Sequence, residues 1–174
     1  MKLDSREVSR LLKEAPNIAI KTAIRTLNRT ADKARVAASR AVREKYNIKA
    51  GDLNKSIKTS RASVSRLETI LTITGKPIGL IAFALNKIKY TGHKILKAGG
   101  RIRLPHTFIA IMKSGHRGVY QREGDERLPI MERKFISMPS VWRSKAVMSV
   151  VERVVDTEIV KEWQANWEYY KGKG

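Results

Sequence analysis

The pattern of hydrophobic and polar positions predicts a long helix near the start of the chain. Between residues 17 and 46, apolar or small residues recur every three or four positions, and mostly basic or polar side chains occupy the rest. Pro16 suits the first turn of this helix, or a break after a shorter helix over 5–14. The small apolar face should let a sheet or another helix approach closely. Its members are Ile20, Ala23, Ile24, Leu27, Ala31, Ala34, Ala38 and Ala41.

A sheet is predicted for the middle of the chain, residues 58–136. Thr, Val and Ile cluster at 64–74, and an apolar run over 78–85 follows a Gly-Lys-Pro break. Gly99-Gly100 predicts a two-residue hairpin loop, because both central positions of such a turn favour positive φ. A further strand is expected within 128–136.

A second long helix is predicted for residues 139–170, with Pro139 in its first turn and Ser137 as its N-cap. A separate short helix is expected over 52–57, with Asp52 as its N-cap. The long helix carries an apolar stripe that consists of Val147, Val151, Val154, Val155, Ile159, Trp163 and Trp167.

This order of elements predicts an α+β fold, with a mostly antiparallel sheet flanked by a long N-terminal helix and a long C-terminal helix. A chain of 174 residues with a hydrophobic fraction of 42% can bury an ordinary globular core. We therefore expect one domain over residues 1–174, helical over 1–57, a sheet over 58–136 and helical over 137–170.

The charge of the chain is strongly positive. Thirty-six Lys and Arg against 16 Asp and Glu give a formal net charge of +20, and residues 69–122 contain ten bases and no acid. Such a field favours an acidic partner, namely nucleic acid, an acidic protein surface or anionic lipid. Incidental charge on a soluble protein is the alternative interpretation.

The chain has no cysteine, which excludes disulfides and cysteine metal sites. The first seven residues lack the apolar core of a signal peptide, and the most apolar run, Ile78 to Leu85, is far shorter than the roughly 20 residues of a membrane span. We expect a protein that is made and used in soluble form, with no membrane partner.

Neither a metal site nor a catalytic site is predicted. The histidines, His93, His106 and His116, all lie in the basic segment, where no carboxylate is available to orient an imidazole, and their spacing fits no usual metal pattern. We expect no cofactor and no enzymatic activity.

The residues around the Gly-rich segment 115–118 are expected to be structural. Its two glycines should permit a tight turn, and neither a helix start nor a GK[ST] sequence follows to make a phosphate-binding loop. The acidic cluster at 123–126 should form a solvated loop rather than an acid–base pair.

Residues 104–130 combine two strand-like pieces with this turn, and their order resembles the minor tail protein Z family of long-tailed bacteriophages and prophages. The matching pieces are Phe108-Ile109-Ala110, Met112-Lys113-Ser114-Gly115-His116, Gly118-Val119-Tyr120-Gln121-Arg122, Leu128-Pro129-Ile130, Pro139 and, in the first long helix, Leu27-Asn28-Arg29.

The resemblance implies a structural protein of the virion that completes the head-proximal end of a phage tail and supports head–tail joining. It would be assembled in the host cytoplasm, act as a homo-oligomeric ring of six copies, and contact other tail and neck proteins. The basic segment would face an acidic partner, either tail protein or phage DNA.

Two groups of residues are the expected contact sites. The partner-binding residues are Lys94, Lys97, Arg101, Arg103, Lys113, His116, Arg117 and Arg122. Trp142, Trp163 and Trp167 are of a type that usually lies in a core. The alternative is a subunit interface, where aromatic residues are enriched, and this is expected for the end of the last helix. Its interface residues are Trp163, Trp167 and Tyr170.

Two other functions are compatible with the charge. A nonspecific DNA-binding protein outside the virion would use the basic segment with Tyr90 and Tyr120 as stacking residues, although no helix-turn-helix, RRM or KH signature is present. An RNA-cleaving toxin would need His116, Arg117 and Tyr120 to converge on a phosphate.

Overall fold

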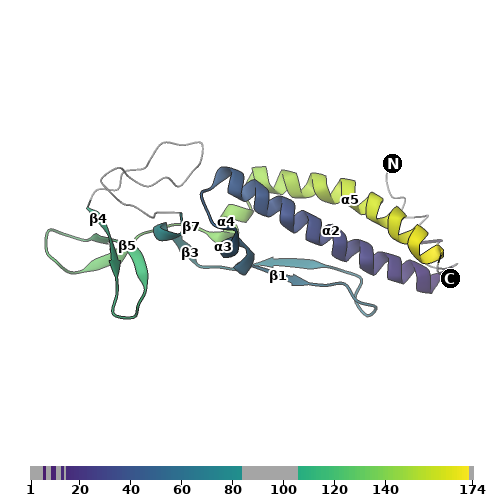
Figure 1. Ribbon diagram of the computed structural model, residues 1–174, viewed down its shortest axis with the longest axis horizontal. Helices are drawn as coiled ribbons and strands as arrows, with labels where there is room; N and C mark the ends of the chain where they lie inside the picture. Colours follow the sequence, from purple (N-terminus) through teal and green to yellow (C-terminus); the bar gives the residue numbers. More distant parts are fainter. Residues whose placement is uncertain (1–5, 7–8, 11–12, 14, 84–105, 173–174) are drawn as a thin grey trace. The chain divides into compact units, whose positions relative to one another are not determined.

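The computed structural model describes residues 6, 9–10, 13, 15–83 and 106–172, and the chain is an α+β protein (Figure 1). The predicted fold class, with a long helix near each end and antiparallel strands between them, is confirmed. The hairpin expected at Gly99-Gly100 lies outside the described residues. The elements are α2 (Pro16–Lys45), α3 (Ala50–Lys55), β1 (Ile57–Ser60), β2 (Ile70–Ile73), β3 (Pro77–Gly79), the 3-10 helix η1 (Leu80–Ala82), β4 (Thr107–Ile111), β5 (Arg117–Arg122), β6 (Ile130–Glu132), β7 (Lys134–Ser137), α4 (Met138–Trp142) and α5 (Lys145–Lys171).

Contacts within the chain divide it into two compact units. The first, which we call the helix unit, contains the described residues of Met1–Ala38, Lys58–Thr72 and Lys145–Gly174. The second, the sheet unit, contains those of Ser39–Ile57 and Ile73–Ser144. The strands form three small sheets in the described part of the chain: β1-β2, β3-β7 and β4-β5-β6. The expectation of a single domain stays a prediction.

In the helix unit, α2 and α5 lie side by side and run antiparallel (Figure 1). The line that α2 buries is rotated from the apolar face expected from the sequence. Ala34 and Ala38 are buried as expected, but Ile20, Ile24 and Leu27 are half-buried. The other buried members of the line are Ala19, Thr22, Thr26 and Thr30.

The two helices are joined by a seam of polar side chains. The Glu162 carboxylate is buried and pairs with Arg29, at 3.0 Å, and with Lys33, at 2.6 Å. Lys33 also pairs with Glu158 at 2.6 Å, and this contact lowers the pKa of Glu158. One turn further along α5, the Asn166 amide donates to the Thr26 hydroxyl at 3.2 Å. Small side chains on α2 allow this close approach, and the polar partners satisfy one another.

The Asn28 side chain attaches the β1–β2 hairpin to α2 through the hairpin backbone. Asn28 Nδ2 donates to the Ala62 carbonyl at 3.2 Å, while Asn28 Oδ1 accepts from the Ala62 amide at 2.9 Å and from the Thr69 hydroxyl at 3.0 Å. Arg61 and Asp32 form an ion pair at 3.1 Å beside this contact. The hairpin is therefore fixed to the helix by backbone hydrogen bonds that Asn28 completes.

The sheet unit has an apolar core. Leu53, Phe83, Val119 and Val141 are fully buried, and Trp142 is 3% exposed, which confirms the expectation that Trp142 is a core residue. The indole Nε1 of Trp142 donates to the Ser56 hydroxyl at 3.2 Å, so the polar edge of the ring is also satisfied.

The C-terminal helical region begins as predicted and is then interrupted. Ser137 is the N-cap of α4, its hydroxyl accepting from the Ser140 amide, and Pro139 occupies the first turn. The single helix expected over 139–170 is divided at Arg143 and Ser144, because α4 belongs to the sheet unit and α5 to the helix unit.

Two local expectations are corrected. The short helix α3 begins at Ala50 after Lys49, so Asp52 is not its N-cap but lies in its first turn, where a carboxylate favours the helix dipole. The strand expected within 128–136 is two strands, β6 and most of β7, that Arg133 separates. The Arg133 amide donates to the Val119 carbonyl at 2.8 Å, and its carbonyl accepts from the Leu80 amide at 3.1 Å.

Candidate functional site

The segment that carries the family-like motif folds into the β4–β5–β6 sheet. Antiparallel pairing places Phe108 opposite Tyr120, and Ile111 opposite Arg117. The next ladder places Tyr120 opposite Glu132. Since residues alternate between the faces of a strand, Phe108, Tyr120 and Glu132 share one face, while Ile111 and Arg117 share the other.

The two glycines of the motif have separate structural roles. Gly115 has φ of 79° in the tight turn between β4 and β5, which confirms the predicted turn. Gly118 is buried, and a Cβ there would lie 3.0 Å from the Tyr120 ring. Because Gly118 has no side chain, the Tyr120 ring can lie against the backbone at this position. Residues two apart share one face of a strand, which explains the spacing of Gly118 and Tyr120.

His116 has a carboxylate partner that the sequence pattern did not indicate. Its Nε2 lies 3.0 Å from the Glu132 carboxylate, and Lys134 approaches the same carboxylate at 3.5 Å. The hydrogen bond from His116 lowers the pKa of Glu132. Glu132 is distant in sequence but lies one strand away in space, so the spacing of the histidines could not reveal it.

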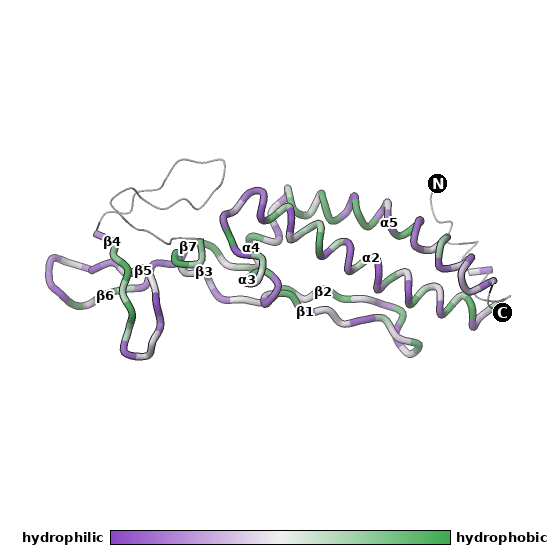
Figure 2. The backbone as a smooth tube through the Cα atoms, viewed as in Figure 1, coloured by the Kyte–Doolittle hydropathy of each residue, from purple (hydrophilic) through white to green (hydrophobic). Residues whose placement is uncertain are grey.

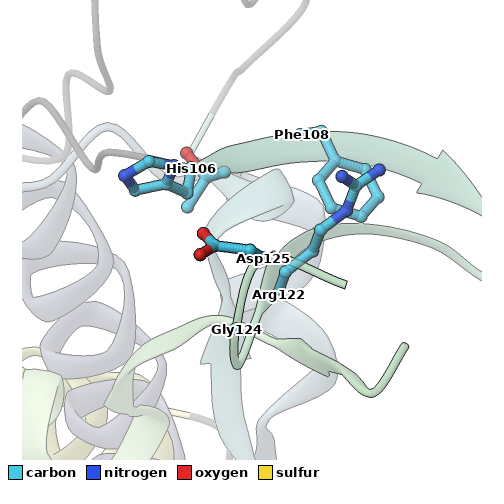
Figure 3. Close-up of a pocket in the computed structure, with 6 residues that line it drawn as sticks. His106, Phe108, Arg122, Gly124 and Asp125 are labelled. Atoms are coloured by element: carbon cyan, nitrogen blue, oxygen red, sulfur yellow. The ribbon is translucent and has the colours of Figure 1, made fainter. Parts of the chain in front are cut away.

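A cavity of about 330 Å³ opens beside the first residues of β4. Figure 3 shows the Arg122 side chain against the Phe108 ring, with Asp125 and Gly124 on the adjoining loop. The Arg122 guanidinium lies 5.6 Å from the centroid of that ring, within the range of a cation–π contact. Positive, negative and aromatic side chains share this open cavity, which His106 and Thr107 also line.

The arrangement argues against the RNA-cleaving alternative. His116 contacts Glu132 on the Tyr120 face of the sheet, whereas Arg117 lies on the opposite face. Tyr120 is 6% exposed, and burial raises the pKa of its hydroxyl. These three side chains do not converge on one phosphate. Within the described residues, no group of three or more His, Asp or Glu side chains could hold a metal ion.

The expected partner-binding residues are only partly brought together. Lys113 and Arg117 are exposed near the tip of the β4–β5 hairpin, and His116 is exposed beside them. Arg122 lies at the other end of β5, in the cavity. The remaining predicted residues, Lys94, Lys97, Arg101 and Arg103, lie outside the described part of the chain. Contact of any of them with a partner stays a prediction.

The expected interface residues lie together on α5. Trp163 and Trp167 are half-buried, and their rings stack 6.4 Å apart with an angle of 8° between their planes. Tyr170 is also half-buried, and its neighbour Tyr169 lies under the Arg25 guanidinium at 4.8 Å. Figure 2 shows how hydrophobic and hydrophilic residues alternate along both long helices. A role between copies of the chain stays a prediction.

Fold and surface together define the class of the protein. It is an α+β protein with ion pairs and hydrogen bonds between α2 and α5 and with exposed basic side chains around the β4–β5 turn. The family model of prophage minor tail protein Z (GPZ) matches residues 1–170, so the chain belongs to this family. No curated protein and no solved structure matches it.

Membership of this family indicates a structural role in the phage tail, as a component of the virion that interacts with other tail proteins. No helix in the described part of the chain is long and apolar enough to cross a membrane. The Asn-Arg step of the family-like motif also has a structural explanation, because Asn28 holds the hairpin and Arg29 holds α5.

Proposed function

We propose that this protein is a non-catalytic subunit that completes the head-proximal end of a long phage tail and supports joining of the tail to the head. The observation that carries the proposal is the family match, which spans residues 1–170 of the 174-residue chain. The polar side chains around Glu132 and Glu162 support the non-catalytic part of the proposal. Their ion pairs are accounted for by contacts that hold the fold together.

The subunits form a closed ring, with six copies, through surfaces that include Trp163, Trp167 and Tyr170. Support comes from the helix unit, in which α2 buries a line of alanines and threonines while larger apolar side chains of α2 and α5 remain partly exposed. Apolar and aromatic side chains left at a surface are typical of a subunit interface.

The basic surface near Lys113, His116 and Arg117 faces an acidic partner, either a tail or neck protein or the phage DNA. The net charge of +20 supports this, since a field of one sign increases the rate of encounter with a partner of the opposite sign.

Deletion of the gene from an inducible prophage tests the proposal. We expect separate heads and tails, with joined virions restored when the wild-type chain is supplied, and immunogold label at the head–tail junction of the restored particles. Normal virions that lack both the gene product and the label would overturn the proposal.

A nonspecific DNA-binding protein outside the virion is the second candidate. The charge of α2 favours it, because the helix carries eight basic and two acidic residues. Binding of duplex DNA that weakens steeply with salt, together with normal virions after deletion of the gene, would support this function over the first. DNA binding together with unjoined heads and tails would instead support contact with DNA within the virion.

A further inference from the structure

Two exposed surfaces of this chain have opposite charge, and each combines charged with apolar side chains. The first is the hairpin tip, which we define as Ile111, Lys113 and Arg117. Ile111 is 68% exposed and lies opposite Arg117 in the ladder, so both side chains are on one face. Lys113 is exposed in the turn between them, and neither Lys113 nor Arg117 makes an ion pair with any described residue. The tip therefore presents two uncompensated positive charges beside an apolar side chain.

The second surface is the outer stripe of α5, which we define as Met148, Glu152, Asp156 and Ile159. Their spacing of four, four and three residues places them on one side of the helix. Met148 is 42% exposed, Glu152 and Asp156 are exposed, and Ile159 is half-buried. Within the described part of the chain, Glu152 and Asp156 have no ion-pair partner. The stripe continues toward the expected interface residues Trp163 and Trp167.

The charged residues of the outer stripe flank the side of α5 that contacts α2. That contact uses Glu158, Glu162 and Asn166, and its two carboxylates are neutralised by Arg29 and Lys33. Glu152 and Asp156 lie on the neighbouring side of the helix. The helix thus has one acidic side occupied within the subunit and another that remains available.

The spacings of the charges on the two surfaces agree. Carboxylates four residues apart on a helix are separated by about 6 Å along its axis. Directly opposed residues of an antiparallel pair are about 4.5–5.5 Å apart, and a turn residue beyond them adds a few ångströms. Lys113 and Arg117 can therefore face Glu152 and Asp156 together, with Ile111 placed against one apolar end of the stripe.

We propose that the hairpin tip of one copy docks onto the outer stripe of α5 in a second copy. Lys113 and Arg117 then face Glu152 and Asp156, while Ile111 packs against the apolar side chain at one end of the stripe. The proposal rests on the proposed ring and names the contact that builds it. Because the two surfaces differ, the contact is heterologous, which is the type that can close into a ring. The exposed apolar Ile111 favours a protein surface over DNA as the occupant.

A cysteine experiment tests the contact directly, since the natural chain contains no cysteine. Full-length Lys113→Cys and Asp156→Cys proteins, one with a tag that changes its mass, are mixed and mildly oxidised. We expect a disulfide-linked mixed dimer. The control is Thr157→Cys, exposed and adjacent to Asp156 but about 100° around the helix, which should give at least about tenfold less mixed dimer. Equal yields from Asp156→Cys and Thr157→Cys would overturn the proposal.

A double variant in one chain, Lys113→Cys with Asp156→Cys, separates contact between copies from contact within a copy. A product of monomer size in dilute solution, with no mixed dimer from the single variants, would show that the tip reaches its own α5, and it would also overturn the proposal.

Charge reversal supplies a second readout. Lys113→Glu with Arg117→Glu, or Glu152→Lys with Asp156→Lys, should weaken self-association at least about tenfold in analytical ultracentrifugation, because like charges then face each other. A mixture of the two reversed proteins should associate again. Unchanged self-association in both reversed proteins, with loss of DNA binding in the Lys113/Arg117 variant, would overturn the contact and assign the tip to DNA.

These outcomes separate the contact from the proposed function. Heads and tails that stay separate when only one of the two surfaces carries reversed charges, with the variant protein present in the tails, support both ideas. Protein present in joined virions whose subunits show no mixed dimer overturns the contact alone. Joined virions that form without the protein overturn the proposed function.

Discussion

The helix unit and the sheet unit bury different kinds of side chain. In the sheet unit the fully buried residues are apolar and come from helices and strands alike, with Phe83 and Trp142 among the largest. In the helix unit the buried line is made of alanines and threonines on α2, facing a carboxylate and an amide on α5. The sheet unit therefore has an apolar core, whereas the contact between α2 and α5 combines small side chains with polar pairs.

This difference bears on how each unit can act in an assembly. Matched polar pairs fix the register of two helices but add little net stability, because desolvation of the charges offsets much of their attraction. The larger apolar residues of α2 and α5 stay partly exposed, so the helix unit can gain further stability when another surface covers them. The sheet unit has its own apolar core, and it too leaves large apolar side chains exposed, among them Ile111, Leu128 and Met131.

Truncation of the sheet-unit core should have the largest effect. Phe83 is fully buried, and Phe83→Ala should lower the free energy of unfolding by about 3–5 kcal/mol, measured by urea denaturation. Phe135→Ala is the matched control, because the Phe135 ring contacts Phe83 edge to face but is 45% exposed. Its cost should be about 1 kcal/mol. Equal losses would contradict the assignment of the core.

Removal of the hairpin attachment should have an intermediate effect. Asn28→Ala leaves the Ala62 amide and carbonyl without their side-chain partner, which should cost about 1–3 kcal/mol. Hydrogen exchange at the Ala62 amide should accelerate. Asn28→Asp keeps an acceptor for that amide, so its free energy of unfolding should lie between those of Asn28→Ala and the wild type. Unchanged exchange at Ala62 in Asn28→Ala would show that the hairpin is held by other contacts.

The polar seam can be examined with two threonines on the same line of α2. Thr26→Val removes the partner of the Asn166 amide and should cost about 1 kcal/mol. The hydroxyl of Thr30, which is also buried, has no hydrogen-bond partner among the described residues, so Thr30→Val should be neutral or slightly stabilising. Thermal denaturation of both variants gives the comparison. A similar loss in the two would mean that the seam does not depend on specific pairing.

The smallest effect is expected from pH. The hydrogen bond from Lys33 lowers the pKa of Glu158 in the folded protein. The ion pair thus stabilises the fold above the usual glutamate pKa of about 4.3, and this contribution is lost as the pH falls through the lower folded value. Lys33→Met should raise the pKa of Glu158 in an NMR titration. Lys161→Met, which removes a cation 3.9 Å from the same carboxylate, should raise it less. A larger rise in Lys161→Met than in Lys33→Met would contradict the assignment of Lys33 as the main cause of the lowered pKa.

The fold could be predicted from sequence wherever local patterns decide it. The bounds of α2 followed from its three-and-four spacing, and Ser137, Pro139 and Gly115 were interpreted correctly because caps, first turns and tight turns depend on a few adjacent residues. The prediction of which side chains of α2 are buried was wrong in part. Threonines counted as polar in the pattern, yet their small side chains suit a close contact with Asn166 and Glu162, which only the fold brings near.

The candidate site was less accessible to sequence reasoning. The pattern indicated Lys113, His116 and Arg117 as neighbours, which is correct for residues around one turn. It did not indicate that Glu132 pairs with His116, or that Arg117 lies on the other face of the sheet, because both facts depend on strand pairing. The sequence also does not indicate that the acidic residues of α5 separate into a paired and an unpaired side, because this separation requires the position of α2.

The sequence by itself determined the class of fold, the positions of the long helices, the turn between β4 and β5 and the family to which the chain belongs. These properties follow from short-range spacing, from turn-forming residues and from a motif that can be recognised in order. The tertiary structure decided which side chains of α2 are buried, how the acids of α5 are divided, and where the last helical region is interrupted. Those properties depend on contacts between residues as far apart as Thr26 and Asn166, whose energies arise only when the chain has folded.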